Sequence, residues 1–190
     1  TLAFLDPPPG PALKEARALL SHIGALDADG RITADGRALQ ALPLPPRLAR
    51  MVVAAARFGQ ADAAADLAAM LVERGLGGDA IDLAERLERF NRERGGRAGD
   101  MRRLAEAWAR TAERSIGKER LEAGEALSPG LLLAFAYPDR VAKARAPGSG
   151  QYLLANGRGG ALEPSQRLAR EPYIVVAEMT GSAQEARIMA

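Results

Sequence analysis

The sequence predicts a mainly α-helical protein with a winged-helix-like segment, a helical bundle and a small, partial antiparallel β region, in that order. Only 4% of the 190 residues are aromatic, while alanine, leucine and arginine are abundant, a composition typical of helices packed through small side chains. Apolar residues recur at intervals of three and four between residues 47 and 116. After residue 150, short runs rich in β-branched and aromatic residues replace that spacing.

Residues 1–46 are predicted to form a linker and the winged-helix-like segment. An early proline run favours an extended linker, and residues 12–20 then have the apolar spacing of a helix. Residues 26–32 predict a turn between two short extended pieces, because Asp and Gly favour the conformations of tight turns. Thr33 can cap a second short helix over residues 34–42. Helix, hairpin and helix in this order are the plan of a small winged helix.

Residues 47–127 are predicted to form a bundle of four helices joined by short, glycine-marked connections. The last of them, Met101 to about Ile116, carries Trp108 on its apolar side, so core packing is favoured over base stacking for this ring. Asp79 is expected to cap the third helix. The solvated face of that helix is expected to carry three ion pairs with the acid first, Asp82/Arg86, Glu85/Arg89 and Glu88/Arg92.

Residues 128–190 are predicted to form one more helix and an incomplete β region. Ser128 and Pro129 are typical of a helix start, and the helix is expected to kink at Pro138 and continue to about residue 144. Three later runs have the composition of strands, namely 152–155, 173–179 and 186–189.

The sequence offers no residues for covalent chemistry. It has no cysteine and a single histidine, His22, which excludes disulfides, thiol catalysis and multi-histidine metal sites. It also lacks the GxxxxGK(S/T) loop that holds nucleoside triphosphates. The glycine cluster at 156–160 has no lysine, hydroxyl or following helix, so it predicts a hairpin turn. We therefore expect no catalytic residue, no metal site and no cofactor in this chain.

Two sets of basic residues are candidates for contact with nucleic acid. Arg103, Arg110 and Arg114 can share one stripe down the fourth bundle helix, spaced to meet successive phosphates. Arg140 and Lys143, together with Arg145, form a second patch beside the β region. The net charge is only +2 and acids lie among these arginines, so a solvated surface is an equally supported interpretation.

The ends of the sequence and its hydropathy indicate where in the cell the protein is expected. No apolar run approaches the roughly 20 residues that a bilayer-spanning helix needs, so no membrane partner is expected. The first residues do not have the pattern of a signal peptide, and both ends look cut. We therefore expect a piece of a longer cytoplasmic protein.

Six stretches carry a resemblance to a known family. Four of them closely resemble the region after the second RecA-like domain of DEAH/RHA helicases, namely residues 4–9, 23–33, 36–37 and 42–51, which include GALDADGRIT and LPLPPRLARM. Two later stretches look like the bacterial HrpB branch in particular, namely 132–142 and 152–159, LLAFAYPDRVA and YLLANGRG.

The resemblance implies a winged helix, a ratchet-like bundle and an OB-like β domain stacked against two RecA-like motor domains of the same chain. It also implies that the longer enzyme moves 3′-to-5′ along single-stranded RNA or DNA, with ATP and Mg²⁺ bound upstream of this chain. The chain would then be an accessory part that guides the strand, using Arg103, Arg110 and Arg114 first, and Arg140 and Lys143 second. Arg47 and Arg50 would hold the winged helix against its neighbours.

Two other interpretations stay open. The chain can be a winged-helix protein-interaction or regulatory module without helicase activity, whose bundle dimerises. It can also be a structural scaffold that docks a partner protein and binds no nucleic acid.

Overall fold

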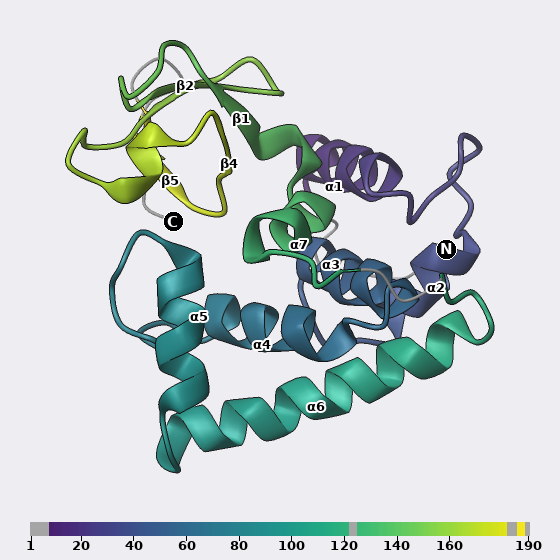
Figure 1. The fold of residues 1–190 in the computed structure, drawn as a ribbon. Helices are drawn as coiled ribbons and strands as arrows, with labels where there is room; N and C mark the ends of the chain where they lie inside the picture. Colours follow the sequence, from purple (N-terminus) through teal and green to yellow (C-terminus); the bar gives the residue numbers. More distant parts are fainter. Residues whose placement is uncertain (1–7, 122–124, 182–185, 189–190) are drawn as a thin grey trace.

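The computed structural model describes residues 8–121, 125–181 and 186–188, so most of the predicted linker lies outside the described residues. The described chain runs through a winged helix and a helical body into a curled sheet (Figure 1). The helices are α1 (Gly10–His22), α2 (Ala34–Gln40), α3 (Pro46–Arg57), α4 (Ala61–Val72), α5 (Leu83–Arg92), α6 (Gly96–Ile116) and α7 (Pro129–Ala136). The predicted fold class, mainly α with a small β region at the end, is confirmed.

The winged-helix segment forms around the predicted turn and cap. Leu26 and Ile32 pair as an antiparallel bridge across the turn. Thr33 caps α2, because its hydroxyl accepts a hydrogen bond from the Gly36 amide at 2.9 Å and donates to the Gly24 carbonyl at 2.7 Å. A side chain at position 36 would bring its Cβ to 2.2 Å from the Ala25 carbonyl oxygen, so glycine lets α2 pack directly on the turn.

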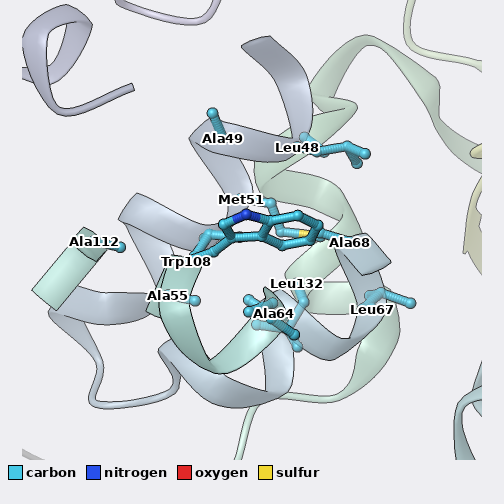
Figure 2. Close-up of a cluster of buried hydrophobic side chains, with 14 of the residues drawn as sticks. Leu48, Ala49, Met51, Ala55, Ala64, Leu67, Ala68, Trp108, Ala112 and Leu132 are labelled. Carbon is cyan, nitrogen blue, oxygen red and sulfur yellow. The ribbon is translucent and has the colours of Figure 1, made fainter. Parts of the chain in front are cut away.

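The core of the helical body is built from small side chains around one large ring. Helix α3 packs against α4, α6 and α7, and α5 lies across the end of α4 (Figure 1). Figure 2 shows Trp108 at the centre of the cluster, beside Met51 and between alanines of α3 and α4. Its side chain is only 7% exposed, which confirms core packing for this ring. The alanines let the helices approach closely enough to enclose the indole.

Helix α5 begins three residues later than the sequence predicts. Asp82, and not Asp79, is the N-cap, because its carboxylate accepts a hydrogen bond from the Ala84 amide at 3.0 Å. The Asp82/Arg86 pair therefore does not form, and Arg86 donates instead to the Leu76 carbonyl at 3.4 Å. The other two predicted pairs, Glu85/Arg89 and Glu88/Arg92, are present.

The prediction that the last helix continues to residue 144 is wrong. Ser128 caps α7 as expected, but α7 ends at Ala136 and a short 3₁₀ turn, η1 (Pro138–Arg140), follows. Pro138 has no amide hydrogen to extend the helix. The next residues form strand β1, whose pairing on both sides buries Ala142 completely.

The six described strands form one curled sheet in the order β4-β1-β2-β3-β6-β5. Its two edge strands, β4 and β5, belong to one continuous segment, 173–181, so the sheet bends back toward itself. All pairs are antiparallel except β3 with β6. The bounds are β1 (Val141–Ala144), β2 (Gln151–Leu154), β3 (Gly159–Ala161), β4 (Tyr173–Val175), β5 (Met179–Gly181) and β6 (Ala186–Ile188).

The strand predictions are partly correct. The predicted strand 173–179 is divided into β4, which pairs with β1, and β5, which pairs with β6. The turn at 156–160 connects β2 to β3 as a hairpin, with Gly157 at a φ of +84°. Strand β3 was not predicted, since its glycines have low strand propensity. At Gly160 a Cβ would lie 3.2 Å from the Ile188 side chain, so a larger residue there would require that side chain to shift.

Three clusters of ion pairs join the regions into one body. Arg47, at the start of α3, donates two hydrogen bonds to Asp139 in η1, at 2.6 and 3.2 Å. Arg167, in a 3₁₀ turn before β4, pairs with Asp82 at the start of α5. The third cluster joins the winged helix to the body, and it consists of Arg57 with Asp35 at 2.5 Å and Glu119 at 2.9 Å.

Candidate nucleic-acid interface

Helix α6 places the three predicted arginines on one exposed stripe. Because 3.6 residues make a turn, Arg103, Arg110 and Arg114 point within about 40° of one another and span about 16 Å along the helix. All three side chains are exposed. The opposite face of the helix is fixed in the core by four buried residues, Met101, Ala105, Trp108 and Ala112. Burial of that face therefore determines the direction in which the arginines point.

Neighbouring acids partly neutralise this stripe. Arg103 pairs with Asp100, and Arg110 lies 3.7 Å from Glu106. Arg114 donates to the Thr111 hydroxyl at 3.2 Å and makes no ion pair with any described residue. Exposed pairs of this kind contribute only about 0–1 kcal/mol, so a phosphate can displace the carboxylates at little cost. The geometry of the stripe thus suits contact with an anion, while its net positive charge is small.

Arg140 and Lys143 do not form one patch of equivalent cations. The Arg140 guanidinium lies 4.9 Å from the centre of the Tyr137 ring and donates to the Ala177 carbonyl at 2.6 Å. These contacts fasten η1 to the segment between β4 and β5. Lys143 is exposed on β1. In Figure 1 the sheet and α6 lie at opposite ends of the molecule, so the two sets of candidates are not brought together.

Arg47 is a structural residue with four contacts. Besides Asp139, its guanidinium donates to the Ala136 carbonyl at 3.0 Å and lies 5.4 Å from the Tyr137 ring centre. Partial burial by itself would raise the pKa of Asp139, but the hydrogen bonds and charge of Arg47 outweigh it and hold that pKa below its ordinary value. Arg47 thus holds the start of α3 against the junction of α7 and β1.

Arg57 is a connecting residue that sequence reasoning missed. Its two acidic partners are 22 and 62 residues away in the chain, so no local pattern indicates the cluster. Arg50, for which a similar role was expected, has one buried guanidinium nitrogen without a hydrogen-bond partner among the described residues.

Asp66 is a partly buried carboxylate of α4. Burial, and then the charge of Asp62, raises its pKa to about 6, while the charge of Arg102 acts in the opposite direction. No group of three or more His, Asp or Glu side chains suited to a metal ion occurs among the described residues. None of the described helices is both long and apolar enough to cross a membrane.

Residues 16–44 match the family model described as the helicase-associated domain (HA2), winged-helix. The ATP-dependent RNA helicase HrpB of Escherichia coli is 34% identical over 99% of this chain, which spans only 22% of that protein's length.

Two solved structures are similar over 98% of the chain. The crystal structure of the E. coli DExH-box NTPase HrpB has a TM-score of 0.68 and 34% identity, and this chain covers 21% of it. A crystal structure of the E. coli DEAH/RHA helicase HrpB has a TM-score of 0.69 and 31% identity, with 22% of it covered. With its match to the HA2 winged-helix model and its similarity from end to end, this chain resembles a region of the HrpB-type DExH-box helicases and spans about a fifth of their length.

Proposed function

We propose that this chain is an accessory, non-motor part of an ATP-dependent helicase and guides single-stranded nucleic acid while the motor moves 3′-to-5′. The observation that carries the proposal is the α6 stripe, where Arg103, Arg110 and Arg114 lie exposed on a helix whose other face is locked in the core. The similarity to proteins titled RNA helicase, NTPase and DEAH/RHA helicase supports the same class of ligand.

Guidance requires contacts that hold a strand loosely. Exposed arginines that already share their charge with carboxylates attract phosphates weakly, so a strand can slide along them. The ion pairs at Arg47, Arg57 and Arg167 keep the stripe in a fixed position relative to the winged helix and the sheet. A movement imposed on one region would therefore be passed on to the others.

The chemistry would belong to RecA-like motor domains of the same cytoplasmic enzyme. ATP and Mg²⁺ would be held by those domains, since this sequence has no GxxxxGK(S/T) loop. We propose that the 190-residue chain alone does not hydrolyse ATP. The three proposed domains are 1–46, 47–127 and 128–190, and the bend of the sheet through 173–181 supports an OB-like last domain.

Anisotropy of labelled single-stranded RNA and DNA across a salt series tests the proposal. Arg103→Glu with Arg110→Glu is expected to weaken binding about tenfold at low salt and to flatten the salt dependence, because two phosphate contacts are lost. The matched control reverses two exposed cations on α1, Lys14→Glu with Arg17→Glu, and should leave binding nearly unchanged. Equal binding by the α6 variant and the wild type would refute the assignment of the stripe.

One observation favours the regulatory alternative. The winged helix has an apolar hollow of about 280 Å³ lined by residues that include Leu20, Leu26 and Leu39, and Ile32 at its wall is 42% exposed. Such a surface suits a protein partner. Tight, sequence-specific binding of duplex DNA, with no preference for single strands, would support this alternative.

A further inference from the structure

The β region joins the helical body through a single stretch of chain. After α7 the chain passes through η1 into β1, and every described element from Val141 onward belongs to the β region (Figure 1). The buried apolar residues form two separate clusters, one in the helices and one in the sheet. Of the described β region, only Ala177 is buried in the helical cluster. Two cores with one covalent connection can turn relative to each other when the contacts between them open.

The contacts at η1 hold one side of this junction firmly. Arg47 donates two hydrogen bonds to Asp139, and Arg140 donates one to the Ala177 carbonyl at 2.6 Å. Both guanidinium groups also lie over the Tyr137 ring. The side chains of Arg47 and Asp139 are only 19% and 22% exposed, so salt screens this pair little. The turn η1 is therefore suited to act as a pivot.

An exposed ion pair closes the other side of the junction. Arg167 lies in the 3₁₀ turn η2 (Arg167–Arg170) and pairs with Asp82, the N-cap of α5. The hydroxyl of buried Tyr152 donates to the Leu168 carbonyl at 2.6 Å, so η2 is fastened to the sheet. The Arg167 side chain is 68% exposed, whereas that of Asp82 is 14% exposed. Pairs with one partner in solvent contribute little to stability and are screened by salt.

Two hollows lie beside this ion pair. The first, of about 320 Å³, is lined by the start of α5 and by residues 166–168. The second, of about 130 Å³, is apolar and lies between α5 and α7 on one side and β4 on the other. Leu168 lines both hollows. Protein cores contain few voids of this size, so the two parts meet here without interlocking side chains.

We propose that the Asp82–Arg167 pair is a releasable latch, and that the β region turns about η1 as one body when this latch opens. While the latch is closed, a movement of the helical body is passed on to the sheet. When the latch is open, the sheet turns separately. High ionic strength favours the open state, because the pair is exposed on its arginine side. The inference concerns motion within the chain and does not depend on nucleic-acid binding.

The distance between two spin labels tests the latch in the 190-residue chain. The sequence has no cysteine, so Asn91→Cys on α5 and Ser165→Cys beside η2 place the labels at two exposed positions only. With the latch residues intact, the labels are expected to give one narrow distance distribution at low salt. Asp82→Asn keeps a capping side chain but removes the charge, and Arg167→Gln removes the other partner. Each of these variants should give a broader distribution that extends to longer distances.

A salt series gives the same test without changing the latch residues. Raising the ionic strength from about 0.1 M to about 1 M shortens the range of electrostatic attraction, so it should broaden the distribution with the latch intact and leave that of the two variants unchanged. The matched control is Arg187→Gln, which breaks the Glu163–Arg187 pair inside the β region. Arg187 is 62% exposed, and its loss should leave the distribution narrow.

The outcomes decide between a latch and a rigid junction. A narrow distribution that neither salt nor the two variants change would show that packing alone holds the sheet, and the latch is then refuted. A distribution that is already broad at low salt with the latch intact would show that no closed state exists, which refutes it equally. Thermal unfolding verifies that each variant is folded. If a variant unfolds, the salt series alone decides.

Discussion

At the scale of single residues, the ionised carboxylate of Asp66 lowers the stability of the folded protein. A carboxyl group with a pKa near 6 in the folded state and near 4 in the unfolded state is protonated more readily when folded. The favourable contribution of this group to the free energy of unfolding is fully present below about pH 4. It is lost as the pH rises through about 6. At neutral pH the ionised group therefore destabilises the protein.

Asp66→Asn is expected to stabilise the protein at neutral pH by about 1 kcal/mol. This is less than the free energy that corresponds to the whole pKa shift, because water reaches part of the side chain. The gain should disappear when unfolding is measured near pH 4, where the carboxyl is already protonated. Urea unfolding at both pH values checks this. A gain of equal size at the two pH values would show that charge is not the cause.

The candidate residues also show what residue types alone could predict. The spacing of Arg103, Arg110 and Arg114 was sufficient to place them on one face, because helix geometry is local. The role of Arg140 could not be predicted, since its partner Ala177 is 37 residues away and on another element.

At the scale of elements, the helices were more predictable than the strands. Helices are indicated by apolar periodicity and by capping residues such as Thr33 and Ser128. These signals involve residues that are close together in the sequence. Strand β1 was mistaken for helix and β3 for a turn, because both owe their form to pairing with distant segments. Asp79 looked like a cap for α5, but the cap is Asp82, which also pairs with Arg167 from the β region.

The contact between α2 and its preceding turn depends on Gly36. Gly36→Ala is expected to lower stability by about 1–3 kcal/mol, because a Cβ would lie 2.2 Å from the Ala25 carbonyl oxygen and force α2 away. Gly99→Ala in α6 is the control, since its Cβ would meet only the far end of a flexible arginine at 4.0 Å. Thermal unfolding of the two variants should differ clearly, and a stable Gly36→Ala protein would contradict this account of the winged helix.

At the scale of the whole molecule, the Arg47–Asp139 pair joins the bundle to the β region. Asp139→Ala is expected to destabilise the protein by about 1–3 kcal/mol, because it leaves a mostly buried guanidinium without its carboxylate. Hydrogen exchange should show faster exchange at η1 and β1 than in the wild type. Faster exchange confined to α1 and α2 would contradict the position assigned to this pair.

The central proposal is that a single strand of nucleic acid runs along α6. Photo-crosslinking of single-stranded RNA to the full-length protein that carries this chain, followed by identification of the linked peptides, tests it most directly. The account predicts crosslinks in the α6 segment from Arg103 to Arg114 that disappear when Arg103 and Arg110 are replaced by glutamate. Crosslinks confined to the winged helix, with none in α6, would contradict it.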